Sequence, residues 1–310
     1  MHSVLVSGSL AYDRIMNFPG SYKDHFHPDT LHALSVSFLV DKLEESLGGT
    51  AGNIAYNLAL LEEKPVLISC AGNDFDKYRR RFAELGIDTS SVQIESDVST
   101  AVAHVITDKD DNQITAFYPG AMMRMYTKEI PDASLAVVSP GRPQEMLELP
   151  KKYRARGVPF FYDAGQQIIA LSGEALQEAI PGAAALFGND YEIAVMLKKL
   201  GWSKEELLTK VPILVTTLGA EGSIVSTREK EYRIAAVKAD KVVDPTGAGD
   251  AFRAGFAKGW LLRLPIDTCA KLASTVAAYA VEEYGTQRHR FSMGELKVRY
   301  EKAYAEKISV

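Results

Sequence analysis

The chain has 310 residues, of which 46% are hydrophobic, and its formal net charge at pH 7 is −5. This size allows one large core, while the acidic balance and the lack of a long lysine–arginine run argue against a nucleic-acid partner. No stretch is apolar over a length that could cross a bilayer, and the two cysteines, Cys70 and Cys269, lack the spacing of a metal site. We therefore expect a cytoplasmic protein in a reducing compartment, with no membrane or nucleic-acid partner.

The first sixty residues combine a buried strand, two exposed segments and a glycine turn. Residues 3–10 are an apolar run that ends near glycine, which predicts a buried strand. Residues 14–21 and 33–43 have the character of half-exposed strands. Residues 48–62 lead from a Gly-Gly pair into an apolar helical pattern.

Strands and helices then alternate along most of the remaining chain. The expected strands are 64–72, 91–95, 135–140, 159–165, 184–189, 211–219, 222–227 and 232–237. The expected helices are 75–86, 143–157, 173–180, 191–201, 250–264 and 267–285. This alternation predicts an α/β fold with a mostly parallel central sheet covered by helices on both faces, in three layers.

Two segments fall outside this alternation and predict a separate small sheet. Residues 100–120 form a hairpin around a polar turn, and residues 13–42 contain the other half-exposed strands. We expect these segments to form an antiparallel lid over a core made of residues 1–12, 43–99 and 121–310. The open edge of such a lid could pair with a second copy in a homodimer, or the lid could close alone.

The stretch from Asp244 to Asp250 reads DPTGAGD and precedes a helical pattern. The following proline pushes Asp244 into an extended conformation, and Gly247 and Gly249 permit backbone angles that other residues resist. Several N–H groups around Ala248 can then converge at the positive end of the helix, a geometry that binds phosphate or a developing anion. Asp250 could accept a proton from a substrate hydroxyl there or could only cap the helix, and the added glycines favour the first role.

Two further turns are expected at the carboxyl ends of strands. Asn189 and Glu192 have the spacing of a capping box, which is the simpler interpretation, although a glutamate there could also hold the water shell of Mg²⁺. Residues 216–223, TTLGAEGS, turn sharply after a buried strand. Open α/β sheets bind ligands at such ends, but a plain turn explains this string equally well.

Polar groups near the start of the chain could bind a polyhydroxyl ligand. The string GGTAGN, residues 48–53, places glycine backbone beside the amide of Asn53 at a helix start. Asp13 follows the first strand, and a carboxylate there could bind two vicinal hydroxyls. A lone aspartate in a loop is more often a turn residue, so this site needs support from elsewhere.

Two clusters resemble metal sites but lack essential parts. Residues 108–112, DKDDN, resemble the start of a calcium loop without its later glycine and glutamate, so a hairpin turn explains them better. His25, His27 and His32 lie close in sequence but have no second ligand cluster for zinc.

Four motifs together carry a resemblance to one family. The string DPTGAGDAFRAGF, residues 244–256, resembles the C-terminal signature of the ribokinase-like (PfkB) family of sugar and nucleoside kinases. Residues 48–61 are similar to its N-terminal glycine signature, residues 188–192 to its N-x-x-E motif and residues 216–223 to its nucleotide loop. The motifs follow the family's order over nearly the whole chain. The resemblance implies a ribokinase-like α/β/α core with a β lid, and transfer of the γ-phosphoryl group of ATP to an alcohol.

The resemblance also implies roles for the matching residues. Asp250 would be the base that activates the acceptor hydroxyl, beside an anion hole formed by the N–H groups of Gly247, Ala248 and Gly249. The residues along ATP would be Asn189, Thr217, Gly219, Gly222, Gly247 and Gly249. The residues that bind the acceptor's hydroxyls would be Asp13, Gly48, Gly49 and Asn53. Asn189 and Glu192 would hold Mg²⁺ through water. Asp244 and Thr246 would bind a monovalent cation, often K⁺.

The acceptor is less sharply indicated. Residues 114–123 and 161–168 resemble the adenosine- and nucleoside-kinase-like subgroup most closely. Phe117 could stack on a base and Gln166 could contact the ligand, although Phe117 could also be an ordinary hairpin aromatic. A nucleoside such as adenosine, phosphorylated on its primary hydroxyl, is therefore favoured over a free sugar such as ribose or fructose. A sensor that binds a nucleoside or sugar without catalysis is a remote alternative, because the sequence retains both the base and the anion hole.

Overall fold

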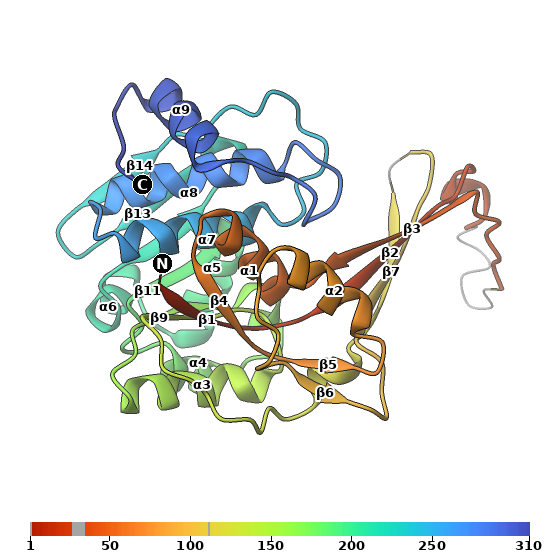
Figure 1. Ribbon diagram of the computed structural model, residues 1–310, viewed down its shortest axis with the longest axis horizontal. Helices are drawn as coiled ribbons and strands as arrows, with labels where there is room; N and C mark the ends of the chain where they lie inside the picture. Colours follow the sequence, from red (N-terminus) through yellow and green to blue (C-terminus); the bar gives the residue numbers. More distant parts are fainter. Residues whose placement is uncertain (1, 27–34, 111) are drawn as a thin grey trace.

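The computed structural model describes residues 2–26, 35–110 and 112–310. A central eight-stranded sheet forms the core, and a smaller sheet extends away from it (Figure 1). From edge to edge the central strands are β14 (Glu231–Ile234), β13 (Ser223–Ser226), β12 (Leu214–Thr217), β11 (Ala185–Asn189), β10 (Phe160–Asp163), β9 (Leu135–Val138), β1 (Ser3–Ser7) and β4 (Lys64–Ile68). Pairing is antiparallel within β12–β13–β14 and parallel elsewhere in the sheet, which confirms the predicted mostly parallel core.

Apolar side chains cover both faces of the central sheet. In β1, Val4 and Val6 belong to one core cluster and Leu5 to the other, because successive side chains of a strand point to opposite faces. The first cluster includes side chains from α1 (Thr50–Leu60), α2 (Asp76–Glu84), α7 (Ala248–Leu261), α8 (Ile266–Ala280) and α9 (Met293–Tyr304). The second includes side chains from α3 (Pro143–Ala155), α4 (Gly173–Ala179), α5 (Asp190–Leu200) and α6 (Lys204–Lys210). The predicted three-layer α/β/α arrangement is therefore confirmed.

The smaller sheet, called the lid below, has four strands. Their order is β3 (Lys42–Gly48), β2 (Ala11–Asn17), β7 (Ala101–Thr107) and β8 (Gln113–Tyr118). The outer ladders β2–β3 and β7–β8 are antiparallel, while β2 and β7 pair in parallel. Pairing of β3 extends to Gly48, beyond the range 13–42 predicted for the first lid segment; the division into core and lid remains a prediction.

Little of the strand predicted at residues 33–43 is found: residues 33–34 lie outside the described residues, and only Lys42 and Leu43 belong to a strand. Residues 35–41 form no strand, and Phe38 instead packs against Phe18 and Tyr22. The strand lies later, at β3, where seven residues pair with β2. An aromatic cluster explains the apolar residues that suggested a strand, whereas β3 is defined by its partner rather than by its own pattern.

Hydrogen bonds tie the root of the lid to the core. The Tyr78 hydroxyl of α2 donates to the carbonyl of Gly48 at 2.7 Å, and the Thr286 hydroxyl donates to the carbonyl of Leu47 at 3.0 Å. On the neighbouring strand, the Tyr12 hydroxyl donates to the carbonyl of Asp74 at 2.8 Å. The lid therefore meets the core through several fixed points rather than through a single loose connection.

Of the two sequence clusters that resemble metal sites, the structure describes most of the first and only part of the second. The Asp108 carboxylate accepts hydrogen bonds from the N–H groups of Tyr22, Asp110 and Asn112, so it closes the hairpin turn as predicted. Of the three histidines, His27 and His32 lie outside the described residues.

A two-stranded sheet is formed by β5 (Cys70–Gly72) and β6 (Gln93–Glu95), so the strand expected at 64–72 is divided into β4 and β5.

Candidate active site

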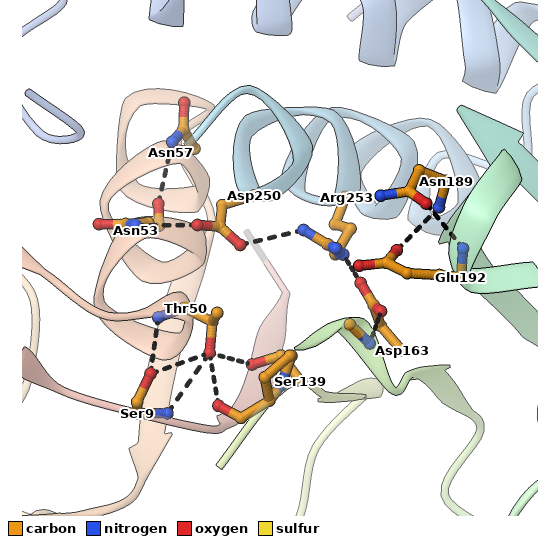
Figure 2. A network of polar contacts seen from close by, with 12 residues as sticks. Ser9, Thr50, Asn53, Asn57, Ser139, Asp163, Asn189, Glu192, Asp250 and Arg253 are labelled. Carbon is orange, nitrogen blue, oxygen red and sulfur yellow. Dashed lines mark hydrogen bonds and ion pairs between the residues drawn. The ribbon is translucent and has the colours of Figure 1, made fainter. Parts of the chain in front are cut away.

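Polar residues from both halves of the chain meet at one end of the central sheet (Figure 2). Asp163 and Asn189 end the neighbouring parallel strands β10 and β11, and Thr217 ends β12 beside them. The carboxyl ends of parallel strands are where open α/β sheets bind ligands. Asp250 reaches this end from the first turn of α7.

Asp250 is held by side chains from two helices. The Asn53 amide of α1 donates to Oδ2 at 2.8 Å, and Arg253 Nη1 donates to Oδ1 at 3.0 Å. The residue is only 7% exposed, and burial raises the pKa of its carboxyl, while Arg253 and Asn53 oppose that rise. A buried carboxylate with its pKa moved upward is suited to accept a proton from an alcohol.

Two residues of this network, Asp163 and Arg253, were missed in the sequence. Arg253 pairs through Nε with the carboxylate of Asp163, whose other oxygen accepts a hydrogen bond from the N–H of Gly165 at 2.7 Å. Burial opposes the charged form of Arg253, but Asp163 and Asp250 outweigh it and raise its pKa. An arginine one turn after an aspartate on a helix was the available signal, because residues at i and i+3 are neighbours.

The start of α7 provides main-chain donors beside Asp250. Gly247 precedes the helix with φ of 80°, a left-handed conformation that favours glycine. The N–H groups of a first helical turn have no partner within the helix, so they can face a bound anion. Of the three predicted anion-hole residues, Ala248 donates its N–H to the carbonyl of Pro245 at 3.2 Å in this structure.

Gly249 has a different reason to be glycine from the one predicted. It lies inside α7 and has no left-handed φ, so backbone freedom is not what it supplies. A Cβ at this position would lie 3.0 Å from Arg253 Nη1. The glycine therefore makes room for the guanidinium against the first turn of the helix.

Asp13 of β2 brings a second carboxylate toward the same site. Burial, with additional repulsion from Asp244 and Asp250, raises the pKa of Asp13 from 3.8 to about 6. A Cβ on Gly48 would lie 2.2 Å from Asp13 Oδ2, and one on Gly49 would lie 2.5 Å from the carbonyl of Ser9. The glycine pair thus lets the lid strand turn into α1 while Asp13 lies against it.

Asn53 is oriented by hydrogen bonds to its neighbours. Its Oδ1 accepts a hydrogen bond from Gln287 Nε2 at 3.0 Å, and its Nδ2 is used by Asp250. The same Gln287 nitrogen donates to the hydroxyl of Tyr78 at 2.7 Å. In this structure Asn53 therefore positions Asp250, and its predicted contact with the acceptor's hydroxyls remains a prediction.

The predicted nucleotide residues occupy the ends of β11 and β12. Asn189 and Glu192 form a complete capping box, each side chain accepting the other's N–H at 2.8 Å, so the simpler interpretation describes their contacts here. Thr217 ends β12 and is followed by Gly219 and Gly222, both with positive φ. A Cβ on Gly222 would lie 2.0 Å from the carbonyl of Ile234, so this turn packs tightly on β14.

The remaining predicted residues lie around this centre. The two Asp244 oxygens accept N–H groups from Thr246 at 2.9 Å and Gly285 at 3.0 Å, which shapes the loop before α7. Gln166 is exposed in the short helical turn η4 (Gly165–Ile169), directly after β10. Phe117 is 49% exposed on β8 of the lid.

The pfkB family carbohydrate kinase model matches residues 1–290. This chain belongs to the pfkB family. A nucleoside kinase from Methanocaldococcus jannaschii is 31% identical over 309 residues, which cover 97% of this chain and 98% of that protein. The predicted family is therefore confirmed, and with it the kinase class of the chain.

Solved structures of pfkB relatives share the fold over the full length. The Burkholderia thailandensis nucleoside kinase in complex with inosine matches with a TM-score of 0.88 and 36% identity, covering 98% of this chain and 99% of that chain. The same enzyme in complex with ADP-inosine matches with a TM-score of 0.85 and 37% identity, covering 98% and 97%. None of the helices in the described part of this pfkB chain has the length and apolar character to span a membrane.

Proposed function

We propose that this pfkB kinase transfers the γ-phosphoryl group of ATP to the primary hydroxyl of a nucleoside. The observation that carries this proposal is the buried Asp250 carboxylate, fixed by Asn53 and Arg253 beside the main-chain amides of a helix start. The names of the full-length relatives support a nucleoside acceptor, and inosine and ADP-inosine complexes of one relative support the two substrates.

In the proposed reaction the protein supplies position and charge. Asp250 accepts the proton of the acceptor hydroxyl as that oxygen attacks the γ-phosphorus of ATP. The N–H groups of Gly247, Ala248 and Gly249 stabilise the charge on the transferring phosphoryl group, which carries most of the catalytic effect in such transfers. Closure of the lid would exclude water and so suppress hydrolysis of ATP.

The strand register supports an acceptor with a base attached to its sugar. Asp13 pairs with Ala103 across β2 and β7, and Ala103 pairs with Phe117 across β7 and β8. Paired residues point to the same face of a sheet, so Phe117 and Asp13 share one face, two strand spacings or roughly 10 Å apart. We infer that Asp13 binds the ribose hydroxyls and that Phe117 stacks on the base above the small side chain of Ala103.

The cation sites are the least constrained part of the proposal. Among the described residues, no three histidine, cysteine, aspartate or glutamate side chains converge to hold a metal by themselves. Mg²⁺ commonly uses one or two carboxylates, several waters and the substrate's phosphates, and half-buried Glu192 fits that outer role beside Asn189. Bound there, Mg²⁺ would neutralise phosphate charge; a monovalent cation such as K⁺ would sit beside Asp244 and Thr246.

We also propose that the enzyme is a homodimer and that it is located in the cytoplasm. The exposed edge strand β8 carries Ile114 and Tyr118, which are 38% and 47% exposed, and this apolar edge supports a homodimer through the lid. Both cysteines are free and buried, as suits the reducing cytoplasm that we propose.

A panel of acceptors tests the proposal directly. ADP release should be measured with ATP and inosine, adenosine, cytidine, ribose or fructose. We expect turnover with nucleosides, whereas turnover only with sugars would favour the sugar-kinase alternative and binding without turnover would favour the sensor. Asp250→Asn should lower kcat by about 10²- to 10⁴-fold while ATP still binds, since a general base contributes about that much. Near-normal turnover in this variant would exclude Asp250 as the base.

A further inference from the structure

Arg253 lies between two buried carboxylates at the centre of the site (Figure 2). Its side chain is 13% exposed, and it pairs with Asp250 on its own helix and with Asp163 at the end of β10. The side chains of Asp163 and Asp250 are 1% and 9% exposed. One guanidinium therefore serves two carboxylates that burial would otherwise drive toward their neutral forms.

The geometry ties this arginine to the reacting group rather than to general packing. Asp250 uses one oxygen for Asn53 of α1 and the other for Arg253 of α7, so two donors on different helices fix the plane of the carboxylate. Each carboxylate oxygen can accept more than one hydrogen bond, which leaves capacity for an acceptor hydroxyl. Gly249 of the anion hole is glycine at the point where the guanidinium lies.

We propose that Arg253 is a positioning residue that keeps the Asp250 carboxylate charged and correctly oriented, and that Asp163 holds Arg253 in place. A structural ion pair alone explains this arrangement poorly. Burying an excess of carboxylates is costly, and apolar residues of similar size often stabilise a core at least as well. This inference rests on the proposed function for its kinetic test only.

Other charged groups also face this cluster. Asp13 of β2 is close enough to Asp244 and Asp250 that their charges add to the effect of burial and raise its pKa. Glu192 of α5 lies toward Arg253 and favours its charged form. All three of these neighbours are acidic, and Arg253 is the cationic side chain that pairs with Asp250. The three acidic groups therefore cannot replace the positive charge that is lost when Arg253 is removed.

The test compares Arg253→Gln, Arg253→Lys and Asp163→Asn with the unaltered protein. The pH dependence of kcat should be measured with ATP and inosine, together with both KM values. In Arg253→Gln we expect kcat at neutral pH to fall at least about ten-fold and the acid limb of the profile to move up by about one pH unit or more. Arg253→Lys should recover part of both effects because it keeps the charge. Asp163→Asn should lower kcat by a smaller factor, because Arg253 loses the partner that holds it in place.

A second measurement separates this inference from the proposed function. Titration of ¹³C-labelled aspartate carboxylates, with Asp250 assigned from the Asp250→Asn variant, needs no turnover. We expect the Asp250 signal to titrate at higher pH in Arg253→Gln than in the unaltered protein. If no nucleoside is phosphorylated, the proposed function fails while this titration still decides the role of Arg253.

Arg299→Gln provides a matched control. Arg299 and Glu282 are each 14% exposed and share two hydrogen bonds, at 2.6 and 2.9 Å, but they lie outside the site. This variant loses a comparable ion pair and should keep the pH profile of the unaltered enzyme. An Arg253→Gln protein that folds and keeps both the profile and the Asp250 titration would overturn the proposal. If Arg253→Gln does not fold, an unshifted Asp250 signal in Arg253→Lys together with a normal kcat in Asp163→Asn would do the same.

Discussion

The position of Asp13 predicts that this residue, which we propose to bind the acceptor, destabilises the folded protein. Burial and the neighbouring Asp244 and Asp250 raise the pKa of Asp13 from 3.8 to about 6. Folded Asp13 keeps its proton to higher pH than unfolded Asp13, so the free energy of unfolding falls as pH rises from about 4 to about 6 and stays lowered above that. A difference of about two pH units corresponds to about 3 kcal/mol, at about 1.36 kcal/mol for each unit.

Asp13→Asn removes this penalty because the amide cannot ionise. Within the described residues the Asp13 side chain makes no hydrogen bond that the substitution would break. We expect Asp13→Asn to unfold in urea with a free energy near that of the unaltered protein at pH 4 and about 3 kcal/mol higher at pH 8. The same substitution should weaken nucleoside binding.

Urea unfolding followed by tryptophan fluorescence at both pH values measures this effect. Asp240→Asn, at an exposed position, is the matched control and should change neither value. The reasoning about Asp13 is refuted if Asp13→Asn shows the same difference from the unaltered protein at pH 4 and pH 8, or if it is less stable at pH 8.

Two further substitutions test the packing of α7. Gly249→Ala places a Cβ 3.0 Å from Arg253 Nη1, so the guanidinium must move. Steady-state kinetics should then show kcat lowered about ten-fold, with little change in melting temperature. A kcat within two-fold of normal would contradict the steric explanation. Lys258→Ala leaves the Glu63 carboxylate, 1% exposed, without the ammonium that lies 2.7 Å away, and should cost about 3–5 kcal/mol in urea unfolding. The double variant Lys258→Met with Glu63→Gln should recover most of that loss, and an equal loss in both proteins would argue against an unpaired buried charge.

The sequence predicted the elements and residues whose signals are local. Alternation of strands and helices reflects burial on both faces of a parallel sheet, and the turn around Gly247 reflects a backbone conformation that glycine favours. Asp250 and Asn189 could be placed at helix starts because capping and anion binding both depend on residues next to one another in the chain.

Features that depend on distant partners could not be predicted in this way. The pairing of Arg253 with Asp163 joins residues that lie on different elements, and neither one has a local pattern that names the other. Strand β3 carries a charged sequence and exists because it pairs with β2. Gly249 was assigned to backbone freedom, whereas its reason is the space taken by a side chain that only the folded helix brings there.

The tethered root of the lid decides how that sheet can move. Because Tyr78, Thr286 and Tyr12 fix its base to the core, we expect the lid to move by bending about that base instead of swinging on a loose hinge. When a sheet bends about a fixed base, its movement is small near that base and grows toward the free tip. We therefore expect the carboxylate of Asp13, close to the fixed base, to stay nearly stationary while the hairpin tip moves furthest.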